Sequence, residues 1–181
     1  MSSVFWVSYA LLWILAILMA FRLMPILRAP RQGMLPAPDD LPMSDHGLPS
    51  GWEFPVLKFP TAEGDAIDLT SDHHKGTLVV LTMPGCKACV SLYPLLAAYM
   101  KEHAEIQTVM LSFMMEDRVI DEDETEALAL PWIGVPKEAQ PQFSTTIFPF
   151  GYFLSPDGTI LRKGVLNTVE HLSLITSAKA S

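Results

Sequence analysis

Two cysteines that lie between a strand-like run and a helix-like segment constrain this chain more than any other feature. Cys86 and Cys89 follow the apolar run 77–82 (TLVVLT), and an amphipathic segment opens at Val90. A strand that leads into C-x-x-C at a helix start is the geometry of a redox-active dithiol. The chain has only these 2 cysteines, whereas a disulfide scaffold uses more and a four-ligand zinc site needs two further ligands. The pattern therefore predicts a reversible dithiol.

The position of each cysteine predicts its role. Cys86 stands at the amino end of the predicted helix, where free backbone N–H groups and the helix dipole favour a thiolate. Lys87 adds a nearby positive charge with the same effect. We therefore expect Cys86 to attack a substrate disulfide, and Cys89, one turn further in, to break the resulting mixed disulfide. The reverse sequence would oxidise a substrate dithiol.

The amino terminus is the second informative feature. Residues 4–23 read VFWVSYALLWILAILMAFRL, and Arg22 is the one charged residue among them. About 20 such residues span the core of a bilayer. A cleavable signal peptide would place charge before a shorter apolar core and end in a small-residue cleavage site, and we find neither feature. Residues 1–31 are therefore expected to be an uncleaved transmembrane anchor with a basic flank.

Composition divides the rest of the chain in two. Residues 32–50 are rich in proline, glycine and aspartate without an apolar period, which predicts a semi-extended linker. Residues 51–181 are enough for one domain with its own core. The net charge of -8 falls on this domain, which argues against a nucleic-acid partner.

Within the domain, hydrophobic periodicity predicts alternating strands and helices. Asn167, with Glu170 three residues on, predicts the amino-terminal cap of the last helix. The acidic segment 116–126 is expected to be a solvated loop and helix start. Strands are predicted at 54–59, 66–69, 77–82, 106–114, 132–135, 150–154 and 159–165. A helix is predicted at 90–103, a helical turn at 136–143, and a last helix from the Asn167 cap to about residue 179.

A proline directly before a predicted strand adds a second element to the site. Pro149 lacks an N–H for a strand ladder, so we expect it to begin the strand at Phe150. In a tight strand start the peptide bond between Phe148 and Pro149 is a candidate for the cis form. The upstream C-x-x-C pair strengthens this expectation.

These motifs together resemble the thioredoxin-like family. Pro94 looks like the family's helix proline, and Pro149 looks like its cis-proline, which faces the dithiol. More narrowly, the chain resembles the membrane-anchored, MauD-like thioredoxin-like accessory proteins of methylamine dehydrogenase maturation. The stretches that carry this resemblance are the anchor, residues 83–89 (MPGCKAC), residues 148–154 (FPFGYFL) and residues 164–172 (GVLNTVEHL).

The resemblance implies an α/β thioredoxin fold, with a central mixed sheet flanked by helices, after a single amino-terminal transmembrane helix. It also implies disulfide formation or isomerisation in proteins outside the cytoplasm. The site it implies is formed by Cys86 and Cys89, supported by Lys87 and Ala88 between them and by Phe148 and Pro149 opposite them.

The chain departs from the thioredoxin pattern at three places. Gly85 stands before the first cysteine where thioredoxins have tryptophan, and Val80 stands where they keep a buried aspartate that handles protons. Proton transfer must then use water or another group. Lys87 and Ala88 replace the usual Gly-Pro pair. Because this dipeptide helps to set thiolate stability, the reduction potential of a relative does not apply to this chain.

We therefore expect a membrane-tethered thiol-disulfide oxidoreductase without cofactor or metal. Its partners would be protein thiol or disulfide clients, the membrane through residues 4–23, and a redox partner that resets Cys86 and Cys89. Two alternatives stay open: a tethered copper or metal chaperone domain that uses both cysteines as soft ligands, and a peroxidase of the same fold. His73 and His74 are expected in an exposed turn, and Met110 in the core.

The orientation in the membrane follows from two opposing arguments. Three arginines follow the anchor and none precedes it, which by the positive-inside bias favours a cytoplasmic domain. The resemblance and a redox function favour the extracytoplasmic side, and this is the location we expect. The sequence leaves open the client, the direction of electron flow and the oligomeric state.

Overall fold

The computed structural model describes residues 41–60, 66–70, 72–114 and 131–177, together with five helical residues near the amino terminus. The chain separates into two compact units, Met1–Leu35 and Pro36–Ser181. Most of the predicted anchor 4–23, and the acidic segment 116–126, lie outside the described residues. Among the residues that are described, no helix is both long and apolar enough to cross a membrane.

The second unit is built on a five-stranded mixed sheet with the order β5-β4-β3-β6-β7. β3 is central and buried along its whole length, as its uncharged β-branched sequence predicts. β3 runs parallel to β4, and β4 runs parallel to β5. β6 is antiparallel to both β3 and β7. The bounds are β3 (Thr77–Thr82), β4 (Gln107–Met114), β5 (Trp132–Pro136), β6 (Phe150–Leu154) and β7 (Ile160–Val165).

Helix α2 (Lys87–Glu102) connects β3 with β4 and completes the predicted β-α-β unit. It begins three residues before the predicted start, because Cys86 caps it. Its apolar stripe, which includes Leu92 and Leu96, is fully buried. Pro94 lies inside the helix on its exposed side and does not end it.

The last helix, α4 (Val169–Thr176), differs from its prediction at the cap. Thr168, and not Asn167, is the capping residue: its Oγ1 accepts a hydrogen bond from the backbone N–H of His171 at 3.3 Å. Asn167 instead donates its backbone N–H to Nδ1 of His171 at 3.2 Å. The prediction of Asn167 was wrong by one residue, because both residue types are good caps and the sequence does not decide between them.

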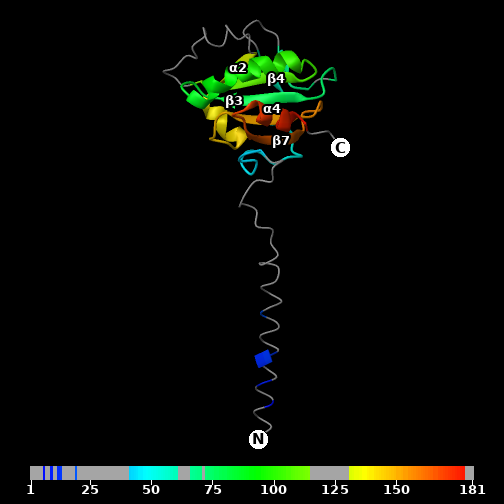
Figure 1. Ribbon diagram of the computed structural model, residues 1–181, viewed down its shortest axis with the longest axis vertical. Coiled ribbons are helices and arrows are strands. Elements are labelled where there is room, and N and C mark those ends of the chain that lie inside the picture. Colours follow the sequence, from blue (N-terminus) through cyan, green and yellow to red (C-terminus); the bar gives the residue numbers. More distant parts are fainter. Residues whose placement is uncertain are drawn as a thin grey trace. The chain divides into compact units, whose positions relative to one another are not determined.

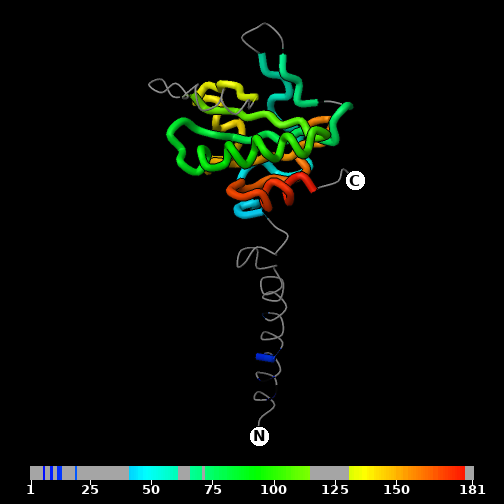
Figure 2. Tube along the Cα trace, turned by 45° about the horizontal axis from the view of Figure 1, so that its top comes forward, coloured from blue at the N-terminus to red at the C-terminus, as the bar shows by residue number. Residues whose placement is uncertain are grey.

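The two faces of the sheet carry separate hydrophobic clusters. Leu78 and Val80 of β3 point to the face that α2 and α4 cover, and Figure 1 shows both helices on this side. Val79 and Leu81 point to the other face. There they pack with Phe54, the hairpin of β1 (Lys58–Pro60) and β2 (Ala66–Asp68), and the 3-10 helix η1 (Lys137–Phe143). Figure 2 shows the β1–β2 hairpin extending beyond the sheet, away from α4.

Residues 41–50, which composition assigns to the linker, are hydrogen-bonded to the sheet. The carbonyl of Pro42 accepts a hydrogen bond from the backbone N–H of Val165 at 2.9 Å. The ammonium of Lys163, whose pKa is lowered by burial, donates to the carbonyl of Gly47 at 3.1 Å. Leu41 is only 4% exposed. We call residues 41–50 the strap, and it is part of the folded unit.

Tyr152 joins the strap to η1 and yields a test of the fold. Its buried hydroxyl donates to the carbonyl of Phe143 at 2.6 Å and accepts from the backbone N–H of Leu48 at 3.0 Å. Burial raises the pKa of Tyr152 to about 12, so the hydroxyl keeps its proton at any ordinary pH. We expect Tyr152→Phe to lower the free energy of unfolding in urea by about 1–3 kcal/mol, because both partners lose their bond.

Tyr99→Phe is the matched control. Tyr99 is also buried, but its partner Thr176 makes a second hydrogen bond, to the carbonyl of Leu172 at 2.9 Å, and keeps it in the variant. Tyr99→Phe should therefore lower the free energy of unfolding by less than Tyr152→Phe does. An equal loss in both variants would contradict the role given to Tyr152.

Candidate dithiol site

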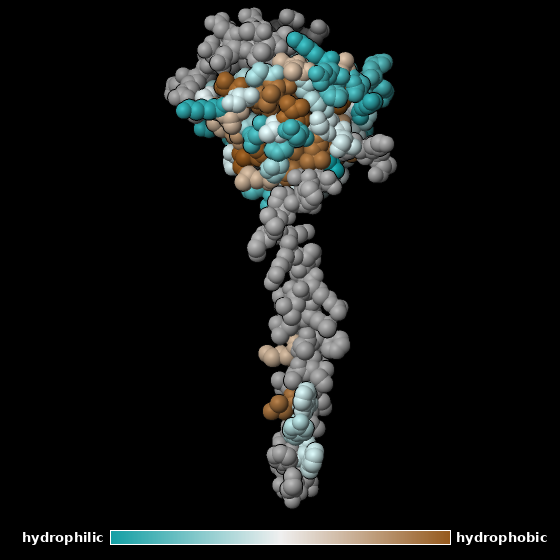
Figure 3. Space-filling view, viewed as in Figure 1, coloured by the Kyte–Doolittle hydropathy of each residue, from teal (hydrophilic) through white to brown (hydrophobic). Residues whose placement is uncertain are grey.

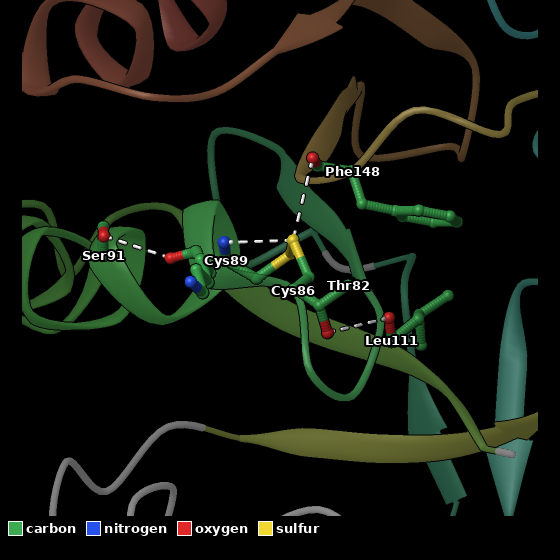
Figure 4. Close-up of a disulfide and its surroundings, with 7 residues drawn as sticks. Thr82, Cys86, Cys89, Ser91, Leu111 and Phe148 are labelled. Carbon is green, nitrogen blue, oxygen red and sulfur yellow. Dashed lines mark hydrogen bonds between the residues drawn. A yellow bond between two sulfur atoms is a disulfide. The ribbon is translucent and has the colours of Figure 1, made fainter.

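The turn after β3 sets the position of Cys86. The backbone N–H of Cys86 donates to the carbonyl of Met83 at 3.2 Å, and Gly85 within this turn has a φ of +76°. A side chain at this φ is disfavoured, so glycine fits the turn where thioredoxins have tryptophan. Cys86 is then the amino-terminal cap of α2, and its Sγ accepts a hydrogen bond from the backbone N–H of Cys89 at 3.2 Å (Figure 4).

Cys86 and Cys89 are joined by a disulfide, and their Cα atoms are 5.3 Å apart. Cys86 is half-buried, whereas Cys89 is completely buried. Lys87 and Ala88 between them are exposed. The arrangement leaves one sulfur within reach of a partner and shields the other, as expected from their places in the helix.

The charge around Cys86 is favourable to an anion. α2 is 16 residues long and has no acidic residue in its first turn, so within the helix no carboxylate opposes the positive end of its dipole. Lys87 adds a positive charge at the surface. Once the disulfide is reduced, this setting favours the thiolate of Cys86 over the thiol.

The loop before β6 lies against the dithiol. The peptide bond between Phe148 and Pro149 is cis, as predicted, and the carbonyl oxygen of Phe148 is 3.8 Å from Sγ of Cys86 (Figure 4). The ring of Phe148 packs edge-on against the fully buried Phe113, with centroids 5.6 Å apart. The structure therefore brings together the two sequence motifs from which the site was predicted.

Below the dithiol the sheet is apolar with two hydroxyls. Val80 and Met110, neighbours on β3 and β4, pack in the same cluster as Cys89. The next residues on the same face, Thr82 and Ser112, are also buried neighbours. Thr82 donates to the carbonyl of Leu111 at 3.4 Å, whereas the Ser112 hydroxyl has no hydrogen-bond partner among the described residues.

Sequence reasoning missed Thr82 and Ser112. The strand alternation that places Val80 on the inner face also places Thr82 there, so the position of Thr82 could have been predicted from the sequence. Ser112 was not, because its place beside Thr82 depends on the register between β3 and β4. That register becomes known only from the structure.

The other residues that were considered as metal ligands lie apart from the dithiol. His73 is exposed in the turn before β3, as expected, whereas His74 is half-buried there. Met110 is a core residue, as expected. Within the described part of the chain, no three His, Cys, Asp or Glu side chains form a group that would hold a metal ion. A surface cavity of about 650 Å³ is lined by His46, residues of η1 and residues 144–146, and Cys86 is not among its lining residues.

Comparison with known proteins identifies the family. The chain is 30% identical over 184 residues to the methylamine utilization protein MauD of Methylorubrum extorquens, with 96% of this chain and 86% of that protein covered. The chain belongs to the MauD family. MauD of Methylophilus methylotrophus is 27% identical over 177 residues, and MauD of Paracoccus denitrificans is 28% identical over 141 residues. These two matches cover 94% and 75% of this chain, and 82% and 68% of the relatives. A comparison with family models finds no match.

Solved structures confirm that this MauD-family chain has the thioredoxin fold. The thioredoxin domain of a thiol-disulfide oxidoreductase from Bacteroides vulgatus matches with a TM-score of 0.57 and 17% identity, covering 70% of this chain and 96% of that domain. StoA from Bacillus subtilis matches with a TM-score of 0.53 and 20% identity, covering 66% of this chain and 95% of StoA. At these identities the likeness is one of fold.

The conformation of Gly85 yields a test of the site in this MauD-family protein. Gly85→Ala forces a side chain into the left-handed region, so the free energy of unfolding should fall by about 1 kcal/mol. The same change should alter the rate at which reduced Cys86 reacts with iodoacetamide, because the turn orients its sulfur.

Gly51→Ala is the control for this change. Gly51 is exposed and also has a positive φ, +86°, with no atom within 4 Å of an added Cβ. It should lose similar stability and leave the alkylation rate of Cys86 unchanged. Equal alkylation rates in both variants would show that Gly85 does not orient the thiol.

Proposed function

We propose that this protein is a membrane-tethered thiol-disulfide oxidoreductase that acts on envelope proteins through Cys86 and Cys89. The observation that carries the proposal is the disulfide at the start of α2, with one half-buried and one fully buried sulfur beside the cis Phe148–Pro149 bond. Two of the matched solved structures, named as a thiol-disulfide oxidoreductase and as a putative thiol:disulfide interchange protein, support this activity.

In the reducing direction the reaction has two steps. The Cys86 thiolate attacks a client disulfide, forms a mixed disulfide and releases one client thiolate. The Cys89 thiolate then attacks Cys86, so that the Cys86–Cys89 bond forms, the bond to the client breaks and the second client sulfur leaves as a thiolate. The reverse sequence transfers the disulfide from the protein to a client dithiol. In either direction a redox partner must reset the pair.

A protein client fits the surface around the dithiol better than a small molecule does. Ala88 and Val90, on either side of the buried Cys89, are exposed, and Val169 at the start of α4 is exposed as well. Figure 3 shows hydrophobic residues gathered over the face that carries α2 and α4. An open, partly apolar surface with a backbone carbonyl beside the sulfur suits an unfolded or extended polypeptide segment.

The membrane and the compartment form the finer part of the proposal. Residues 4–23 have the length and composition of a single membrane span, and a dithiol that oxidises clients is most useful outside the cytoplasm. We therefore propose an extracytoplasmic domain. The relatives are named for methylamine utilization, so an envelope protein of that process is the first client to test.

Cysteine variants test the two-step reaction. Cys86→Ser should abolish exchange with a protein disulfide, because no nucleophile is left within reach. Cys89→Ser should keep the first step and accumulate mixed disulfides, visible as adducts on non-reducing gels and by mass spectrometry. Ser91→Ala is the control, because Ser91 lies on the exposed side of α2 and its hydroxyl donates to the backbone carbonyl of Lys87, away from the sulfurs.

Retained turnover in Cys86→Ser would overturn the proposal. Tight, stoichiometric Cu(I) binding without any exchange would instead favour the metal chaperone, and rapid peroxide consumption the peroxidase. The reduction potential of the Cys86–Cys89 pair then gives the direction of electron transfer between this protein and its clients. A value near -120 mV indicates a disulfide donor, and a value near -270 mV a reductant, on the approximate scale of related folds.

A further inference from the structure

Ser112 is a buried polar residue whose hydroxyl has no partner among the described residues of the disulfide form. Its residue is 1% exposed, and its Oγ makes no hydrogen bond to any described residue. Buried hydroxyls are almost always hydrogen-bonded, because an unpaired one carries its full desolvation cost. An unpaired hydroxyl on the sheet face that packs against Cys89 is available to a partner that forms in the other redox state.

The position of Ser112 indicates that partner. Ser112 is the register neighbour of Thr82, which precedes Cys86 by four residues, and it follows Met110 on the face that packs with Cys89. Thr82 directs its own hydroxyl to a backbone carbonyl, as Figure 4 shows. On the other side Ser112 is paired with Gly134, which has no side chain. The groups in this cluster whose bonding changes with redox state are the sulfurs of Cys86 and Cys89, and of the two Cys89 is fully buried.

A buried Cys89 needs such a donor when the disulfide is reduced. Burial disfavours the thiolate that must form before Cys89 can attack. None of the described Asp, Glu, His, Lys or Arg side chains is buried, so no charged group of that part of the chain can support the thiolate from inside the core. The titratable groups in the same cluster are Cys86, Tyr93 and Tyr99, and the Tyr99 hydroxyl is bonded to Thr176.

We propose that the Ser112 hydroxyl donates a hydrogen bond to the sulfur of Cys89 in the reduced protein and so speeds the second step of exchange. This rests on the proposed function. In that step the Cys89 thiol loses its proton to water, its sulfur bonds to Cys86, and the sulfur of the client leaves with the electron pair of the broken bond. Ser112 keeps its own proton throughout and stabilises the negative charge on Cys89 before the attack.

A reaction with 5,5'-dithiobis(2-nitrobenzoate) separates the two steps in the reduced full chain. Attack by Cys86 releases one thionitrobenzoate anion, and attack by Cys89 on the resulting mixed disulfide releases a second, so stopped-flow absorbance records each rate. We expect Ser112→Ala to leave the first rate unchanged and to slow the second about 2- to 10-fold at pH 7, the value of one hydrogen bond. The pH at which the second rate reaches half its maximum should rise.

Two further variants make the test specific. Ser112→Thr keeps the hydroxyl and should restore most of the second rate and its pH profile. Thr108→Val removes another buried hydroxyl from β4 on the same face, four residues further from the dithiol end, and should change neither rate. Oxidised Ser112→Ala should unfold at the same temperature as the parent protein or at a higher one, because the variant removes a buried hydroxyl that has no partner among the described residues.

The outcomes are distinct. If Ser112→Ala and the parent share the same second rate and pH profile, the proposal is wrong, even though both releases occur. An equal slowing by Thr108→Val would also overturn it, because the effect would then come from packing. If Cys86 of the parent protein releases no thionitrobenzoate, the proposed function itself is refuted.

Discussion

The antiparallel pairing of β3 with β6 is the constraint on which the site depends. Leu81 near the end of β3 is paired with Phe150 at the beginning of β6. The chain that leaves β3 therefore meets the chain that enters β6 at one edge of the sheet, and Cys86 comes to lie beside Phe148. The two parts of the site are far apart in sequence, and this one pairing brings them together. β4 and β7 pair with the outer sides of these two strands, and α2, α4 and η1 cover the faces of the sheet.

The division of the core into two faces gives the dithiol its chemical environment. The face under η1 holds a group of packed aromatic rings among aliphatic side chains, and Phe113 extends this packing to the ring of Phe148. The face under α2 is mainly aliphatic, with Tyr93, Tyr99 and Phe153, and encloses Cys89. Since β3 and β4 contribute to both faces by simple alternation, residues that hold the proline loop and residues that surround the buried sulfur alternate along the same strands.

Much of this organisation was predictable from local pattern. The central strand 77–82 and the pairing of residues 150–154 with the following strand have short-range signals, and the structure confirms both. The cis bond before Pro149, also confirmed, was expected from its place at a strand start together with the distant C-x-x-C pair. The cap of α4 was misplaced by one residue, because Asn167 and Thr168 are equally good candidates locally. The strap and Ser112 could not be predicted, because their roles depend on contacts between residues far apart in the sequence.

The strap changes how far the dithiol can reach if residues 4–23 lie in a bilayer. A chain that was free from residue 24 to residue 50 would span at most about 95 Å, at about 3.5 Å per residue. Because Pro42 and Gly47 are hydrogen-bonded to β7, residues 24–40 alone lie between the proposed anchor and the strap, and their greatest span is about 60 Å. If the proposed anchor is correct, the contacts of Lys163 and Val165 with the strap shorten the distance from the membrane at which Cys86 can meet a client.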